Sequence, residues 1–394
     1  MKKNAILCLM LMLVSSSFFA GCVRASSGKS PEGMSETTIN SEMRTSKNST
    51  KIQVAILLDT SGSMQGLIEQ TKSRLWNIVN TLTTLKYQGK SPSIEIALYE
   101  YGSYEIKNSE YIRQVAPLTA DLDLISEKLF ALRAGGSEEY CGAVIDKAVR
   151  SLEWGNNETD IKLIYIAGNE VFTQGRISYK TAIQSALNKN IYVNTIHCGD
   201  PETGIRDLWR DAAIRGQGKF FNINSNVRVR HVVTPYDDRI SHYNSRLNDT
   251  YLSFGHKGHE KKENQARQDM NAKSISGANY AERAVSKSKS VYNNSSWDLV
   301  DKMKEDSNAL AAISNDELPS ELKDKSDAEI KKIVSEKEKE RVTIQKEIAE
   351  LAKKRQAYID EELKKDGDED DLGNAINRSI VDFANKKGYT VESL

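Results

Sequence analysis

The stretch that decides the fold reads Ile52-Gln-Val-Ala-Ile-Leu-Leu-Asp59, followed by the turn Thr60-Ser-Gly-Ser-Met64. The first part is an almost unbroken apolar run, which is typical of a strand buried on both faces of a sheet. Apolar residues then recur at helical spacing from Leu67 to Leu82. A buried strand, a tight turn and an amphipathic helix in this order predict the first unit of an α/β fold.

The alternation of strand and helix continues to residue 223. Further strands are expected at 94–101, 111–115, 161–167, 191–197 and 219–223, and helices at 122–132, 143–154, 179–187 and 205–214. This rhythm predicts a doubly wound, mainly parallel sheet with helices on both faces. Such sheets bind ligands at the carboxyl ends of their strands, so a site is expected at the turn after the first strand.

The amino-terminal segment is typical of an exported protein. Lys2 and Lys3 precede a short apolar run, and the segment ends in Phe19-Ala-Gly-Cys22. The run is too short to span a bilayer, so residues 1–21 are expected to be a signal peptide. Small residues before a Cys resemble the bacterial lipobox, which implies lipid on Cys22 and attachment to the cell envelope, at the outer membrane if the source is Gram-negative. An ordinary cleaved signal followed by an incidental Cys is the alternative.

Composition divides the rest of the chain. Residues 22–50 are rich in Ser, Thr and Asn, which predicts a flexible tether, and the α/β domain is expected to span 51–232. Residues 233–325 indicate a polar linker with short helices. Residues 326–365 predict an amphipathic charged helix that packs on the domain or on a partner, with a coiled coil as the alternative. Residues 366–394 indicate an acidic loop and a short terminal helix.

Charge and cysteine content narrow the partners and the redox chemistry. Lys+Arg and Asp+Glu are both 55, so no basic excess favours nucleic acid as a partner. Besides Cys22, the expected mature chain holds Cys141 and Cys198, both placed near the site end of the sheet. An exported protein meets an oxidising compartment, so these two form a disulfide or remain buried thiols.

The turn after the first strand carries a pattern suited to a metal ion. Asp59, Ser61 and Ser63 stand at positions i, i+2 and i+4, so one carboxylate and two hydroxyls converge on one point. A hard cation such as Mg²⁺ takes oxygen ligands and keeps several waters. Hydroxyl ligands leave much of its charge uncompensated, which favours an acidic group from a partner as a further ligand. The alternative is that Asp59 or Ser61 caps the following helix.

Residues 51–232 resemble a von Willebrand factor A-type domain, and Asp59, Ser61 and Ser63 match its metal-ion-dependent adhesion site. The charged helix and several short motifs are similar to those of a group of bacterial A-domain proteins, so the resemblance runs along most of the mature chain.

The resemblance implies two further metal ligands, a Thr from a second loop and an Asp from a third. Ser137 stands at the Thr position and keeps a hydroxyl. Gly168 stands at the Asp position, so Asn169 or Glu170 would have to serve in its place.

These features predict a membrane-anchored protein, not an enzyme, that binds a protein or peptide ligand with an acidic group through Mg²⁺ or Mn²⁺. One alternative is a structural envelope lipoprotein whose metal site is vestigial, which Gly168 favours. The other is a metal-dependent phosphohydrolase, because some of these enzymes also begin with an Asp at the end of a buried first strand. They need a second acid two residues on, and that position is Ser61 here.

Overall fold

The computed structural model describes residues 50–108, 110–136, 138–366 and 372–392. The expected signal peptide, Cys22 and Ser137 lie outside these ranges. Among the described residues, no helix combines the length and the apolar character needed to cross a membrane.

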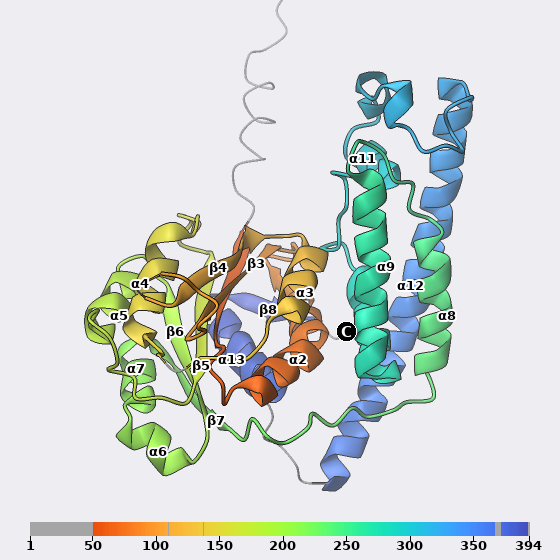
Figure 1. Ribbon diagram of the computed structural model, residues 1–394. Helices are drawn as coiled ribbons and strands as arrows, with labels where there is room; N and C mark the ends of the chain where they lie inside the picture. Colours follow the sequence, from red (N-terminus) through yellow and green to blue (C-terminus); the bar gives the residue numbers. More distant parts are fainter. Residues whose placement is uncertain (1–49, 109, 137, 367–371, 393–394) are drawn as a thin grey trace, which may run out of the picture. The chain divides into compact units, whose positions relative to one another are not determined.

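Six strands form one sheet in the order β4-β3-β1-β5-β6-β7 (Figure 1). They are β1 (Lys51–Asp59), β3 (Ser93–Tyr101), β4 (Ile112–Thr119), β5 (Ile161–Gly168), β6 (Tyr192–Cys198) and β7 (Gln217–Ile223). Neighbouring strands from β3 through β1 to β7 are parallel, and β4 at the edge is antiparallel to β3. The doubly wound, mainly parallel fold expected from the sequence is therefore confirmed.

Side chains of β1 alternate between two helical layers, because successive residues of a strand point to opposite faces. Val54, Ile56 and Leu58 belong to one apolar cluster, and Ala55 and Leu57 belong to the other. The first face is covered by α2 (Gln65–Thr83), α3 (Leu122–Ala131) and α13 (Leu372–Lys386), and the second by α4 (Cys141–Ser151), α5 (Tyr179–Leu187) and α7 (Trp209–Arg215). Burial on both faces explains the unbroken apolar run of β1.

The single helix expected at 205–214 is wrong. The chain forms α6 (Pro201–Arg206) and then α7, and Leu208 between them has a φ of 73°. This left-handed conformation breaks the helical hydrogen-bond ladder, and it is uncommon for a residue with a side chain.

The carboxyl-terminal residues return to the sheet. In α13, Ser379 hydrogen-bonds the Tyr165 hydroxyl on β5, and the ring of Phe383 lies 5.1 Å from that of Tyr192. The final strand β8 (Tyr389–Val391) then pairs with β2 (Leu85–Tyr87) in an antiparallel ribbon. The sequence analysis ended the α/β domain at residue 232, whereas the structure adds this terminal segment to the same core.

Residues 237–366 form a helical part beside the sheet. Its helices are α8 (Asp237–Asn248), α9 (Gly258–Ile275), α10 (Gly277–Lys287), α11 (Leu299–Glu305) and α12 (Asp327–Asp366), with short 3₁₀ turns at Ala309–Ala312 and Asn315–Glu317. The long α12 packs against α8, α10 and α11. Arg355 lies within the apolar stripe of this helix and is buried. Its Nε donates to Asp237 Oδ1 at 2.8 Å, which offsets the cost of burying the charge.

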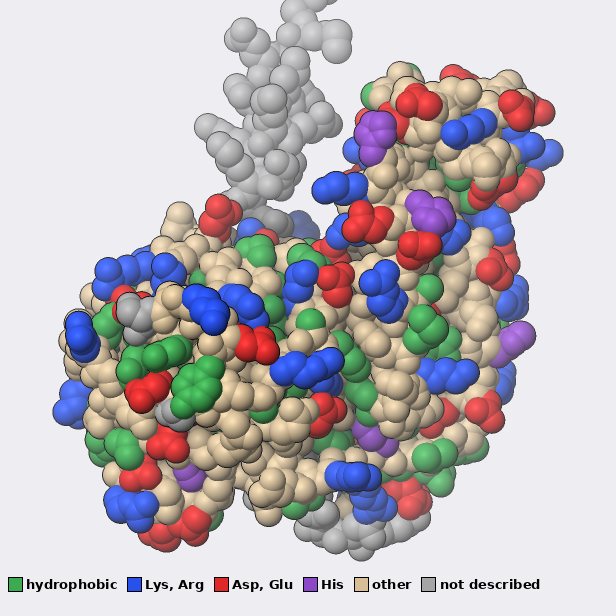
Figure 2. Space-filling view, viewed as in Figure 1, with side chains coloured by type: hydrophobic (Ala, Val, Ile, Leu, Met, Phe, Trp, Pro, Cys, Tyr) green, Lys and Arg blue, Asp and Glu red, His purple; other side chains and the backbone are tan. Residues whose placement is uncertain are grey.

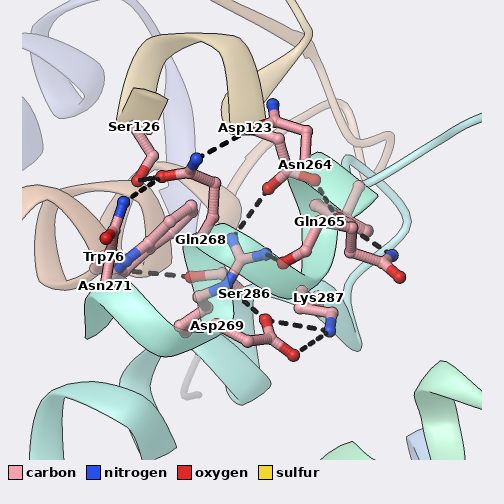
Figure 3. A network of polar contacts seen from close by, with 12 residues as sticks. Trp76, Asp123, Ser126, Asn264, Gln265, Gln268, Asp269, Asn271, Ser286 and Lys287 are labelled. Carbon is pink, nitrogen blue, oxygen red and sulfur yellow. Dashed lines mark hydrogen bonds and ion pairs between the residues drawn. The ribbon is translucent and has the colours of Figure 1, made fainter. Parts of the chain in front are cut away.

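A buried ionic network joins the helical part to the sheet-covering helices (Figure 3). Arg283 of α10 is fully buried and donates to Asp123 of α3 at 2.8 Å and to Asp269 of α9 at 2.5 Å. Its guanidinium also lies 4.6 Å from the ring centroid of Trp76 in α2. Lys287 completes the network with an ion pair of 3.0 Å to Asp269. Two cations thus face two carboxylates with little access to water.

We expect Arg283→Met to lower the free energy of unfolding by about 3–5 kcal/mol, because it leaves buried carboxylates without their cation. Arg246→Met is the matched control, since Arg246 and Glu340 form an exposed pair 3.7 Å apart and such pairs contribute at most about 1 kcal/mol. Urea denaturation of both variants measures the difference. Equal unfolding midpoints would show that the network does not hold the two parts together.

Candidate metal site at the end of strand β1

Main-chain hydrogen bonds to neighbouring segments hold the loop after β1 in place. The Thr60 amide donates to the Tyr101 carbonyl at the end of β3 at 2.9 Å. The Gly62 amide donates to the Gly136 carbonyl at 3.1 Å, and the Gly135 amide donates to the Thr60 carbonyl at 2.8 Å. The loop is therefore clamped between the loop after β3 and the loop that precedes α4.

The side chains of this loop do not cap the helix that follows it. Asp59 Oδ1 accepts from the Ser61 amide at 2.7 Å, inside the turn itself. Helix α2 begins after Met64 and has no side-chain cap. The capping alternative is therefore wrong, and the second carboxylate oxygen of Asp59 remains available.

Four buried polar atoms in this region have no hydrogen-bond partner of ordinary geometry among the residues that the structure describes. They are Asp59 Oδ2, Ser61 Oγ, Glu139 Oε2 and Asn169 Oδ1. A buried polar atom without a partner costs free energy, and most such atoms in folded proteins are paired. All four are oxygens that can accept a hydrogen bond or bind a hard cation. This is the feature of the site that most needs a physical explanation.

The structure brings Asn169 to the first loop, as expected from the sequence. Its Nδ2 donates to the Ser63 hydroxyl at 3.2 Å. Glu170 is half-buried like Asn169, its Oε2 accepts from Gln174 Nε2 at 3.2 Å, and its charge contributes to the raised pKa of Asp59 and of Glu139. Ser137, the expected hydroxyl of the second loop, lies outside the described residues.

Glu139 is a site residue that the sequence analysis missed. A Cβ atom built on Gly102 would lie 3.1 Å from Glu139 Cγ and 3.2 Å from Asp59 Oδ1, so both acids border the same small space. Only 3% of Glu139 is exposed, whereas its neighbour Glu138 is on the surface. Two adjacent Glu residues after a Gly-Gly turn were the available signal, but the sequence does not say which of them points inward.

The carboxyl groups of Asp59 and Glu139 both hold a proton to a higher pH than ordinary carboxyl groups, because their pKa values are raised. Burial is the main cause that raises the pKa of Asp59 to about 7, and the charge of Glu139 adds to it. Burial likewise raises the pKa of Glu139 to about 7, with a contribution from the charge of Glu170. A cation between these groups would remove both penalties.

Steric crowding explains why position 168 is a Gly. A Cβ atom on Gly168 would lie 2.7 Å from the Tyr101 hydroxyl and 3.0 Å from Asp59 Oδ2. Tyr101 is fully buried, and its hydroxyl donates to the Ala167 carbonyl at 2.9 Å. An Asp at position 168 would therefore have to displace a buried phenol, and the third loop contributes no carboxylate at that point.

Cys141 and Cys198 are both buried, free thiols in the structure. The disulfide that the sequence left open is not formed. Burial raises the pKa of both thiols above the ordinary value, so both are poor nucleophiles.

No group of three or more His, Cys, Asp or Glu residues in the described ranges is arranged to hold a metal ion. A cation at this site would instead need a mixed set of carboxylate, hydroxyl and amide oxygens. That set suits Mg²⁺ or Mn²⁺ better than a metal that prefers nitrogen or sulfur.

Comparison with known proteins identifies the α/β part. The family model described as von Willebrand factor type A domain matches residues 53–231. No curated protein matches the chain.

Solved structures similar to the chain cover less than half of it. They include the conserved hypothetical protein BatB from Bacteroides thetaiotaomicron, with 16% identity over 44% of this chain and 90% of that one and a TM-score of 0.35. An aerotolerance-related membrane protein from Bacteroides fragilis shows 18% identity over 44% and 93%, with a TM-score of 0.31. Proximal thread matrix protein 1 from the mussel byssus, with a zinc-occupied MIDAS motif, shows 11% identity over 45% and 43%, with a TM-score of 0.34. Identities this low carry no information about what this chain binds.

We expect Asp59→Asn to stabilise the metal-free protein at pH 8. The pKa of Asp59 is raised from 3.8 to about 7 in the folded state. The stability linked to this proton is therefore present at low pH and is lost as the pH rises through 7, at about 1.4 kcal/mol per unit of pKa shift. In EDTA, urea midpoints should favour the variant at pH 8, and the difference should shrink by pH 5. Identical midpoints at pH 8 would mean that the carboxylate is not buried without compensation.

Proposed function

Because residues 53–231 form a von Willebrand factor type A domain, we propose that this protein captures a protein or peptide ligand through a divalent cation held at the end of β1. The observation that carries the proposal is the group of four unpartnered buried oxygens on three loops. A single cation would satisfy all of them, whereas the one hydroxyl hydrogen of Ser61, which lies within reach of both carboxylates, can serve one of them at a time.

Asp59, Ser61 and Ser63 would hold the cation, as their spacing in the turn implies. Asn169 would add an amide oxygen, since its nitrogen is already engaged with Ser63. Glu139 would supply the second carboxylate in place of the acid that position 168 cannot carry. Carboxylate, hydroxyl and amide oxygens are hard ligands, and they favour Mg²⁺ or Mn²⁺.

Two carboxylates change what the partner must provide. Asp59 and Glu139 together balance the charge of a divalent cation, so an acidic group of the ligand gains less than it would beside hydroxyls alone. The ligand would then need further contacts around the site. Tyr104 is 60% exposed beside the second loop, where its amide donates to the Gly135 carbonyl at 3.0 Å, and Val171 is 39% exposed after Glu170. A ligand whose acidic group is flanked by apolar side chains would fit between Tyr104 and Val171.

The surface of the α/β part is compatible with such a ligand. Figure 2 shows apolar side chains next to acidic ones on the face of this part that is in view. Isolated exposed apolar residues are common, but apolar residues grouped around a polar centre are typical of binding surfaces.

We further propose that the protein is exported and anchored to the envelope by lipid on Cys22. This rests on the charged, apolar and small-residue order of the first 22 residues.

Binding is proposed over catalysis because the polar groups of the domain that the structure describes do not form an evident reaction centre. His197 at the end of β6 is buried, and its Nδ1 lies 2.8 Å from Asn222 Oδ1. Position 61, where a phosphohydrolase of the kind considered would carry its second acid, is Ser. Hydrolysis of a generic phosphate ester in Mg²⁺, abolished by Asp59→Asn, would overturn this part of the proposal.

We expect Mg²⁺ or Mn²⁺ to raise the unfolding midpoint of the wild-type protein, because binding to the folded state adds about 2.7 kcal/mol at a hundredfold excess over Kd. Asp59→Asn and Glu139→Gln should lose most of this gain. Glu138→Gln is the matched control, since Glu138 is exposed and accepts a hydrogen bond from the Tyr140 hydroxyl at 2.9 Å.

The outcomes of the titration separate the alternatives. No gain in the wild type at millimolar metal would favour a structural protein with a vestigial site. A full gain in Glu139→Gln, with loss in Asp59→Asn, would keep the metal and remove Glu139 from its ligands.

A pull-down from envelope extract tests the ligand. The wild type in Mg²⁺ should retain proteins that are lost both in EDTA and with Asp59→Ala. The Glu138→Gln variant should retain them. Partners that survive both chelation and Asp59→Ala would mean that binding does not use this site.

A further inference from the structure

A cavity of about 750 Å³ lies apart from the candidate metal site. Its walls come from α2, the end of β7, the irregular segment 224–232, the last turns of α12, and α13. None of the described candidate metal ligands lines it. The volume falls within the range of pockets that hold small organic molecules, about 300–1,000 Å³.

The cavity walls carry more positive than negative side chains. Six Arg or Lys residues line it, namely Arg74, Lys219, Arg228, Arg230, Arg355 and Arg378, against the four acids Glu282, Asp360, Asp382 and Glu392. Lys219 pairs with Asp382, and Arg355 lies 3.7 Å from Glu282. Glu392 pairs at 3.5 Å with Lys86, which lies outside the lining.

Four further guanidinium groups therefore line the cavity together with Asp360 and with Glu282, because Arg355 is paired more closely with Asp237 at 2.8 Å. Arg74, Arg230 and Arg378 each have an interaction partner as well, so a bound anion would share these groups with their present neighbours. Arg74 is only 8% exposed, which places one of the cations where water screens it little. Guanidinium groups match phosphate and carboxylate geometry well.

The lining also offers acceptors that need a donor. Gln70 donates through Nε2 to the carbonyls of Asn224 at 2.8 Å and Val227 at 2.9 Å, while its Oε1 is buried without a partner. Asn377 donates to Asn77 Oδ1 at 2.6 Å, and its own Oδ1 is likewise buried without a partner. An inorganic anion offers few donors to such oxygens, whereas hydroxyl groups do.

We propose that this cavity binds a small organic anion that also carries hydroxyl groups, of the sugar phosphate kind. The guanidinium groups face the anionic end, and the Gln70 and Asn377 oxygens accept from the hydroxyls. The ligand contacts both the α/β part and α12. This binding does not depend on the proposed cation site.

Isothermal titration of the full mature chain in EDTA tests the proposal with glucose 6-phosphate as the probe. EDTA removes any contribution from the cation site. We expect saturable binding that weakens as salt is added, because the contact is ionic. Glucose and inorganic phosphate should each bind at least about tenfold more weakly, since glucose lacks the negative charge and inorganic phosphate lacks the sugar hydroxyls.

Two pairs of substitutions locate the binding. Arg228→Gln with Arg378→Gln removes two exposed lining charges and should weaken binding about tenfold or more. Arg150→Gln with Arg215→Gln removes two exposed arginines of α4 and α7 and should leave it unchanged. Circular dichroism checks that each variant is folded.

Three results would overturn the proposal. They are no heat of binding from glucose 6-phosphate at millimolar concentration, equal binding of inorganic phosphate or of glucose, and equal affinity of the lining and control variants.

Discussion

Strand β1 must be buried on both faces, and the rest of the structure follows from this constraint. It lies between β3 and β5, and nearly every one of its residues is buried. Covering both faces takes helices from distant parts of the chain, including α13 near its end. Because the strand is buried along its length, its last residue is buried too. Asp59 is fully inaccessible to solvent, and this turns an acidic residue into a group that needs compensation.

The strand-helix rhythm was predictable because local periodicity reflects burial. The return of α13 was not, since an overall fall in apolar density hides a short helix whose Ile376, Ile380 and Phe383 recur at helical spacing. Leu208 broke an expected helix through a backbone conformation that its residue type disfavours. Arg355 places a charge within the apolar stripe of α12, and the sequence does not show that its partner is the buried Asp237 of α8.

Some residues of the candidate site could also be identified from the sequence, and others could not. Asp59, Ser61 and Ser63 were identifiable because their spacing within one turn determines their geometry. Glu139 was not, because its inward direction depends on how its loop packs against Gly102, and this contact joins distant parts of the chain. The absence of an acid at position 168 was visible in the sequence, but its cause, the buried hydroxyl of Tyr101, appears only when β3 and β5 are placed on either side of β1.

Helix α2 connects these features. It begins directly after the loop of Asp59, and one turn or two further on its Gln70 and Arg74 line the cationic cavity. It also packs on α10, where Asn80 donates to the Glu282 carbonyl at 3.0 Å and the Ser73 carbonyl accepts from Asn279 at 2.8 Å. A helix held by hydrogen bonds on its backbone and by buried charge cannot shift freely. The helical part therefore braces α2, and through α2 it helps to fix the end of the loop that carries Ser61, one of the residues with an unpartnered oxygen. Oxygens that are held in place before a cation binds lose less conformational entropy on binding. The packing of the helical part on α2 is therefore expected to raise the affinity of the site for a cation.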